Sequence, residues 1–93
     1  MQKTFLSDQA KEFRSRYGIQ NSSSLPSRNK QKNLIVEEFK EFLEAEGMLF
    51  RNNPVFPAEA LKELADLVYV CYQYADNMNW SLDEALDRVH KSN

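Results

Sequence analysis

The stretch LIVEEFKEFLEAEG, residues 34–47, decides the fold class and raises the main question about function. Its apolar residues recur at the spacing of an amphipathic helix, without the alternation that is typical of a strand. The last eleven residues contain five carboxylates. On an ordinary surface helix, carboxylates lie opposite the apolar side.

Two of these five carboxylates point toward the apolar side. At about 100° per residue, Glu37 and Glu44 project away from the apolar arc, whereas Glu38 falls inside it and Glu41 lies at its edge. Burying one unpaired carboxylate is costly, and burying two together costs more unless a cation joins them. The arc consists of Leu34, Ile35, Val36, Phe39, Phe42, Leu43 and Ala45.

A second acidic pair follows in the segment ELAD, residues 63–66. Glu63 and Asp66 are three residues apart, so they share one face of a helix. If the two acidic helices pack antiparallel, they bring four oxygen donors together, a set that suits Mg²⁺ or Mn²⁺. A di-iron centre would need Glu-x-x-His on two helices, and the one histidine, His90, lies outside both pairs. The main apolar stripe of this helix, which is expected to face the core, consists of Leu61, Leu64, Ala65, Val68, Cys71, Tyr72 and Ala75.

The rest of the chain is also typical of helices. Helical spacing predicts elements at residues 4–17, 27–47, 57–78 and from 82 onward, with a serine-rich loop at 21–27. Gly18 and Gly47 are expected to end the first two helices, and Ser81 is expected to cap the last, with Glu84 as its capping-box partner. The sequence therefore predicts an all-α, four-helix bundle formed by residues 1–93 as one domain.

Composition excludes several classes of function. A chain of 93 residues is expected to form one domain with a small core. One cysteine excludes an internal disulfide and a cysteine-cluster zinc site. The net charge is −2 without a basic block, so we expect neither DNA or RNA nor a membrane as a partner. We also expect a cytoplasmic location, since no secretory signal or membrane span is evident.

The acidic motifs together resemble a known signature. EEFKE (37–41) followed by ELAD resembles the EExxE…ExxD pattern of the MazG-like all-α nucleoside triphosphate pyrophosphohydrolases. The flanking segments RNKQKNLIVEE (28–38), ELADLVYVCYQYA (63–75) and SLDEALDRVHKSN (81–93) look like the corresponding segments of small family members. The resemblance covers about residues 28–93 and implies a bundle that is completed by oligomerisation, as a dimer or tetramer.

The resemblance also implies a reaction and a set of residues. The expected enzyme is Mg²⁺-dependent, with Mn²⁺ as a possible substitute, and converts a (deoxy)nucleoside triphosphate to monophosphate and pyrophosphate. The implied metal ligands are Glu38, Glu41, Glu63 and Asp66, of which Glu38 and Glu41 are also assigned as catalytic. Glu37 matches the first acid of the motif, but its direction toward solvent argues against a direct ligand. Asn93 matches a family asparagine near the nucleotide.

Other residues are candidates for substrate contact. Tyr69 lies on the helix near Asp66 and could stack on a base, and Asn77 lies on the Asp66 side. Lys30, with Arg28 and Lys32, could stabilise the leaving pyrophosphate, although a solvated helix start is the favoured explanation for these three. Two other functions stay open: a non-catalytic helical oligomerisation module, and a phosphoribosyl-ATP pyrophosphohydrolase with the same acidic pattern. The direction of Glu38 argues against the module.

Overall fold

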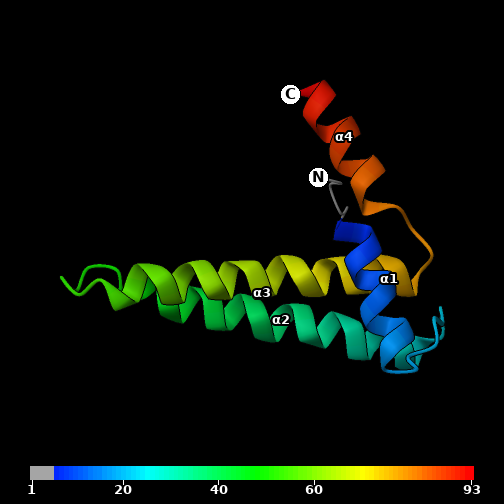
Figure 1. Ribbon diagram of the computed structural model, residues 1–93, viewed down its shortest axis with the longest axis horizontal. Coiled ribbons are helices and arrows are strands. Elements are labelled where there is room, and N and C mark those ends of the chain that lie inside the picture. Colours follow the sequence, from blue (N-terminus) through cyan, green and yellow to red (C-terminus); the bar gives the residue numbers. More distant parts are fainter. Residues whose placement is uncertain (1–5) are drawn as a thin grey trace.

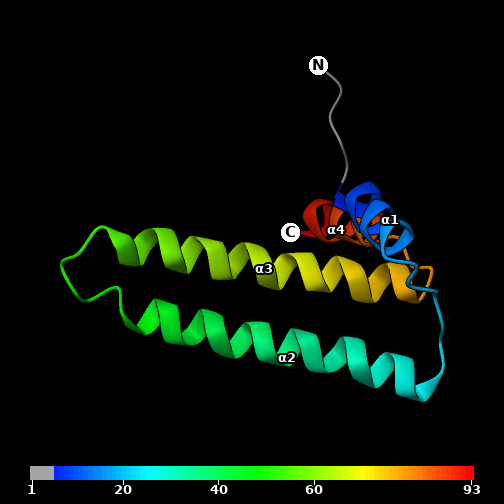
Figure 2. The ribbon, with the colours of Figure 1, turned by 60° about the horizontal axis from the view of Figure 1, so that its bottom comes forward.

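The chain folds into four helices arranged around one long hairpin. The computed structural model describes residues 6–93, which contain helices and turns but no strand. The helices α2 (Leu25–Gly47) and α3 (Val55–Asn77) run antiparallel side by side (Figures 1 and 2). The shorter α1 (Leu6–Arg16) crosses the hairpin near the end of α3, and α4 (Leu82–Ser92) projects away from it (Figure 1). The predicted all-α, four-helix class is confirmed.

The helix starts differ from the prediction by a few residues. The cap of α2 is Ser24, whose hydroxyl accepts a hydrogen bond from the Ser27 backbone N–H. The loop predicted to reach residue 27 therefore ends three residues earlier. In the same way α3 begins at Val55, two residues before the predicted start at residue 57, so Pro57 lies in its first turn. Ser81 caps α4 as predicted, by accepting from the Glu84 N–H.

One of the predicted helix ends has a backbone conformation that differs from the expectation. Gly18 has a φ of +64° and follows α1 in a left-handed conformation, as expected of a residue that ends a helix. Asn79, with a φ of 59°, does the same after α3. Gly47, by contrast, lies inside the last turn of α2, which is followed by Met48 in the right-handed region. Gly47 is the last residue of α2, as predicted, but it lacks the positive φ expected of a glycine at a helix end, because ordinary turn bonds close this end.

The interior at the α1–α3 crossing is small and contains many polar groups. Apart from Tyr72, its buried hydrophobic side chains near the crossing are alanines. Beside them lie Arg14 and Asn77, only 3% and 1% exposed, with the Arg14 Nη2 donating to Asn77 Oδ1 at 2.7 Å. Asp76 is also buried and pairs with Lys11 at 2.7 Å. This polar cluster attaches α1 to the hairpin. No helix in residues 6–93 is long and apolar enough to cross a membrane.

One carboxylate joins α4 to the rest of the fold. Asp83 accepts hydrogen bonds from the hydroxyl of Ser7 in α1 and from that of Tyr72 in α3, the latter at 2.8 Å. These bonds, with that from Ser7 contributing most, lower the pKa of Asp83 below its ordinary value. The first turn of α4 is thus held by an ionised carboxylate.

The lowered pKa of Asp83 predicts a loss of stability in acid. Because the carboxyl binds its proton less readily in the folded chain, its stabilising contribution is full above its ordinary pKa of 3.8 and is lost as the pH falls through the lowered value. We expect Asp83→Asn to weaken this part of the pH dependence, as measured by urea unfolding across the acidic range. Asp87→Asn, on the exposed side of the same helix, is the control. Identical acid profiles for both variants would contradict the assignment.

Candidate metal centre and adjoining cavity

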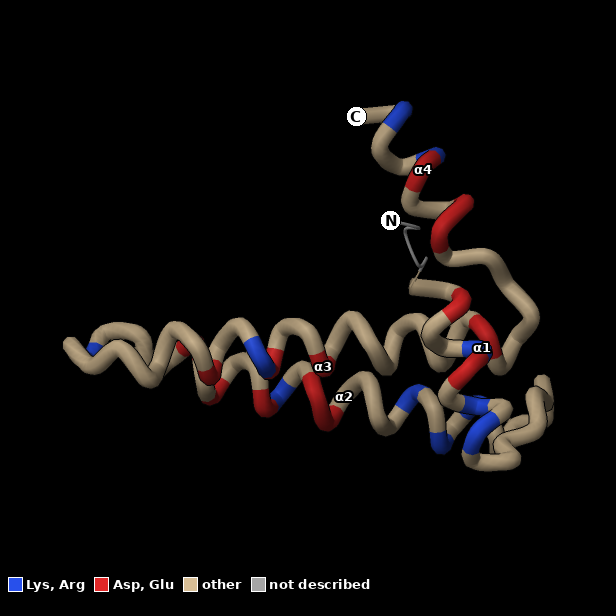
Figure 3. The backbone as a smooth tube through the Cα atoms, in the orientation of Figure 1, with Lys and Arg blue, Asp and Glu red and all other residues tan. Residues whose placement is uncertain are grey.

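Three carboxylates from the two long helices meet near the middle of the hairpin. Glu38 and Glu41 come from α2 and Glu63 from α3, and one oxygen of each lies within 4.8 Å of the others. Glu38 and Glu63 are half-buried, whereas Glu41 is exposed. Acidic residues occur on both helices along this part of the hairpin (Figure 3). The prediction that Glu38 points inward from α2 is confirmed, while Glu37 and Glu44 are exposed.

The cluster concentrates negative charge at one point. The nearby carboxylate of Glu38, and then that of Glu63, raise the pKa of Glu41 above its ordinary value. The Oε2 atoms of Glu38 and Glu63 are buried and have no hydrogen-bond partner. Such atoms are costly in a folded protein unless a positive charge satisfies them. The arrangement therefore favours a bound cation.

The fourth predicted ligand lies outside this group. Asp66 Oδ2 is 3.1 Å from the ammonium group of Lys62, which is also 3.6 Å from Glu63 Oε1. Lys62 thus neutralises part of the acidic face of α3, at an exposed position where it can move. The structure brings together three of the four predicted ligands, and ligation by Asp66 stays a prediction.

The donor set fits a hard divalent cation. All three groups are carboxylates, and Mg²⁺ and Mn²⁺ prefer oxygen ligands to nitrogen or sulfur. An octahedral Mg²⁺ site places its ligands about 2.1 Å from the ion, so opposite ligands are about 4.2 Å apart. One oxygen of each residue lies within 4.8 Å of the others, which is close to this value. Glu38, Glu41 and Glu63 are therefore the residues that would hold the ion.

A cavity of about 230 Å³ lies between α1, α2 and α3, two helical turns from the acids along α2. Two predicted substrate residues, Lys30 and Tyr69, line it, while Arg28 and Lys32 do not. Phe13 of α1 meets Tyr69 edge to face, with the ring centroids 5.7 Å apart. The cavity was not predicted from the sequence, since it depends on how α1 crosses the hairpin.

Sequence analysis also missed two buried amides in the cavity wall. Gln31 and Gln73 are 7% and 5% exposed, and each has one amide atom without a hydrogen-bond partner. A signal existed for Gln31: it precedes Glu38 by seven residues, so it shares the inward face of α2. Neither glutamine was predicted as a site residue, because an uncharged amide does not stand out in the charge pattern of a helix.

The two predicted asparagines lie apart from the acids. Asn77 is buried at the α1–α3 crossing, where its Oδ1 accepts from Arg14, the Ser22 backbone and Ser27, and its Nδ2 donates to the Ser22 carbonyl. This geometry gives Asn77 a structural role and does not support substrate contact. Asn93 ends α4, which projects away from the hairpin (Figure 1). Its predicted contact with a nucleotide is not formed within one chain and stays a prediction.

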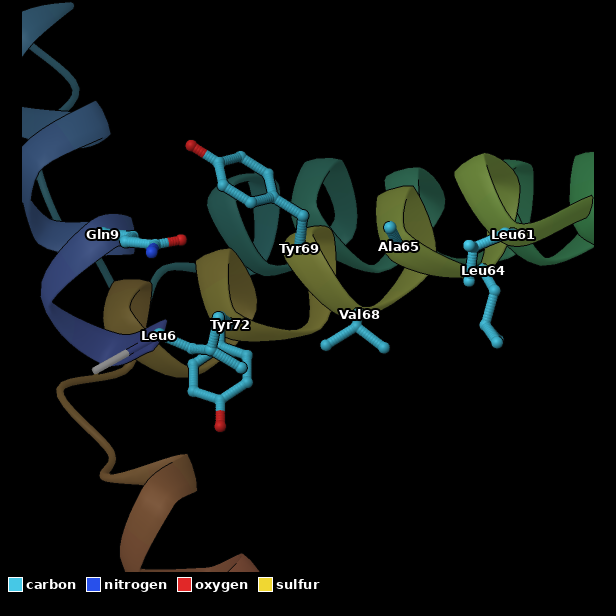
Figure 4. Close-up of a pocket in the computed structure, with 8 residues that line it drawn as sticks. All are labelled: Leu6, Gln9, Leu61, Leu64, Ala65, Val68, Tyr69 and Tyr72. Carbon is cyan, nitrogen blue, oxygen red and sulfur yellow. The ribbon is translucent and has the colours of Figure 1, made fainter. Parts of the chain in front are cut away.

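A separate apolar groove of about 400 Å³ runs between α1 and the stripe of α3 that was predicted to be core (Figure 4). Only the end of this stripe is covered: Tyr72 is 4% exposed, whereas Leu61 is 67% and Val68 is 41% exposed. The prediction of a fully buried stripe is therefore wrong for the single chain. By helical direction this stripe lies opposite Glu63, so the groove and the acids occupy different faces of α3.

Four helices with acids shared across an antiparallel pair define the class as the all-α MazG-like pyrophosphohydrolases. Comparison with protein families gives the particular family: the model for phosphoribosyl-ATP pyrophosphohydrolase matches residues 2–93, almost the whole chain. The chain belongs to this family and is a pyrophosphohydrolase acting on nucleotide-like substrates. Neither the curated proteins nor the solved structures gave a significant match.

Proposed function

We propose that the protein is a Mg²⁺-dependent enzyme that hydrolyses a (deoxy)nucleoside triphosphate to the monophosphate and pyrophosphate, with Mn²⁺ able to replace Mg²⁺. One observation carries the proposal: Glu38 and Glu63 each hold an unpaired, buried carboxylate oxygen beside Glu41. A bound Mg²⁺ would satisfy these atoms, neutralise a triphosphate and lower the pKa of water. The family match supports the proposal, because a pyrophosphohydrolase could use a metal ion held by this cluster.

The three carboxylates are expected to have different roles because they differ in burial. Glu38 and Glu63, half-buried and fixed on facing helices, hold the ion and through it the phosphates. Glu41 is exposed beside them and adds a third carboxylate that can both contact the ion and accept a proton. It would take a proton from the attacking water as the new oxygen–phosphorus bond forms and the α–β anhydride bond breaks. Lys30, at the nearby cavity, would offset the charge on the phosphates.

Pyrophosphate release tests the proposal. The substrates are the eight canonical dNTPs and NTPs, each measured with Mg²⁺, with Mn²⁺ and with EDTA. Metal-dependent release from at least one nucleotide, with no release in EDTA, is the expected result. A folded protein that neither binds Mg²⁺ nor releases pyrophosphate would overturn the proposal in favour of the non-catalytic helical module.

Phosphoribosyl-ATP belongs in the same panel, because the family carries its name. Its hydrolysis uses the same chemistry at the same anhydride bond, so the acidic cluster fits both substrates. The comparison of kcat/KM for phosphoribosyl-ATP with that for the triphosphates decides between them. A value at least tenfold higher for phosphoribosyl-ATP would identify it as the substrate and overturn the triphosphate assignment while leaving the metal site intact.

We also propose that the chain associates with itself. The apolar groove on α3 is open, and α4 has no buried residue, with Leu86 and Val89 about half exposed. Both surfaces are apolar and belong to the same chain, so a second copy can cover them with like surfaces. Each leucine or valine that becomes buried contributes about 1.5–3 kcal/mol. This matters because the core of the single chain is small.

Val68→Asp is expected to shift the protein toward monomer, because it places a charge at the centre of the groove. Light scattering coupled to size exclusion measures the mass. Lys40→Asp, on the exposed side of α2, controls for the added negative charge and should leave the mass unchanged. A wild-type protein that is monomeric at micromolar concentration would contradict self-association.

A further inference from the structure

Lys62 pairs with both of the predicted metal ligands that α3 contributes. Its ammonium group is 3.1 Å from Asp66 Oδ2 and 3.6 Å from Glu63 Oε1. Glu63 belongs to the group of three carboxylates, and its other oxygen, Oε2, is buried without a hydrogen-bond partner. A lysine of the chain itself therefore supplies positive charge to one side of the proposed metal centre.

Asp66 lies on the part of the hairpin where the other acids gather. The helices α2 and α3 run antiparallel, and on α3 Asp66 is about one turn farther from the hairpin tip than Glu63. On α2, Glu38 is about one turn farther from the tip than Glu41, in the same direction. The carboxylate of Asp66 does not join the group of three, and its Oδ2 accepts a hydrogen bond from Lys62 instead.

A lysine ammonium and a divalent cation compete for carboxylate oxygens. The ammonium binds them as a hydrogen-bond donor with one positive charge, whereas Mg²⁺ binds them directly at about 2.1 Å with two charges. An ion held by Glu63 would lie close to the ammonium of Lys62, and charges of the same sign repel strongly at such short range. Binding of the ion and pairing of Lys62 with these carboxylates therefore oppose each other.

The ion pair between Lys62 and Asp66 can be exchanged at low cost. The two residues are four apart on an exposed face of α3, and pairs of this kind stabilise a helix only weakly. The lysine precedes the acid, which is the less favourable order along a helix. The flexible stem of lysine lets the ammonium leave without any movement of the backbone.

We propose that Lys62 is an internal competitor of the divalent cation. In the metal-free protein it pairs with Asp66 and Glu63, and it leaves them when the ion binds, so that Asp66 becomes a further ligand. The proposal rests on the proposed function, because the ion is the one assigned to Glu38, Glu41 and Glu63. It goes further by naming the residue that sets the concentration of free Mg²⁺ or Mn²⁺ at which the site fills.

Mn²⁺ binding to the full-length protein without nucleotide tests this role, with EPR measuring the free ion during the titration. Lys62→Met removes the ammonium but keeps a long side chain that favours a helix, and it should tighten Mn²⁺ binding by about fivefold or more. Lys62→Arg, which keeps the charge, should bind Mn²⁺ as weakly as the wild type. Lys40→Met removes an exposed positive charge next to Glu41 in the sequence and is the control, with a change in Kd of less than about twofold.

A second substitution shows whether Lys62 acts through Asp66. In the Asp66→Asn background, Lys62→Met should change the Kd for Mn²⁺ by less than about twofold, because the ligand that it would free is absent. An equal gain in both backgrounds would mean that Lys62 only repels cations, and this result would overturn the proposal.

The same titrations separate this proposal from the proposed function. Mn²⁺ binding to the wild type with no gain in folded Lys62→Met, as checked by circular dichroism, would overturn the role of Lys62 and leave the metal centre standing. Absence of Mn²⁺ binding in the wild type and in every variant would overturn the metal centre and the role of Lys62 together.

Discussion

Glu38→Gln combined with Glu63→Gln is expected to lower metal-dependent pyrophosphate release by more than about 100-fold. Loss of a residue that only supports a metal ligand costs up to about 100-fold, so loss of two ligands should cost more. The two substitutions remove the unpaired, half-buried carboxylates on both helices while keeping the size of each side chain. Without metal, the variant should be at least as stable as the wild type, because less charge is concentrated between α2 and α3. The measurements are pyrophosphate release and Tm, each with Mg²⁺ and with EDTA.

Glu44→Gln is the matched control for this experiment. Glu44 lies on the same helix as Glu38 but on its exposed side, so its loss should change neither activity nor the effect of Mg²⁺ on Tm. In the wild type, Mg²⁺ should raise Tm by binding the folded state, and the double variant should lose this increase. A double variant that unfolds in EDTA, beside a wild type that does not respond to Mg²⁺, would show that the two acids are structural.

The acidic site could be predicted from sequence because one helix has a carboxylate on its apolar side, where a charged group is not expected. Glu38 falls in an apolar arc, and helical geometry fixes that direction to within a fraction of a turn. The structure confirms the inward direction of Glu38 and places it beside Glu63. Asp66 could not be settled in the same way. Its carboxylate pairs with Lys62 at 3.1 Å, and helical periodicity does not predict where such a long, exposed side chain lies.

The helical stripe of α3 shows where periodicity fails. Leu61, Leu64 and Val68 form a regular apolar face, which sequence analysis assigned to the core. In the single chain that face is largely open, and the opposite face, with Glu63, packs against α2. Periodicity identifies a face that avoids water but does not say whether the same chain or a second copy covers it. The cavity between α1, α2 and α3 was missed for a related reason, since residues from three helices form its wall.

Asn77→Ala is expected to destabilise the folded chain by about 3 kcal/mol, because it leaves several buried polar groups without partners at once. Asn77 is 1% exposed, and its amide bonds with the Arg14 guanidinium and with both the N–H and the carbonyl of Ser22. Losing it leaves a buried charged side chain without one of its acceptors and frees the segment before α2. For a domain of this size, about 3 kcal/mol lowers Tm by about 10 °C or more.

Thermal unfolding at fixed protein concentration measures this effect, with Asn33→Ala, an exposed asparagine of α2, as the control. The same variant distinguishes a structural from a substrate-binding Asn77. A structural role predicts a large loss of Tm, with kcat/KM nearly unchanged at temperatures where the variant is folded. A substrate-binding role predicts the reverse, a raised KM with little change in Tm. Because the side chain is enclosed by α1, the 21–24 segment and α3, and because its oxygen already accepts three hydrogen bonds, the first result is expected.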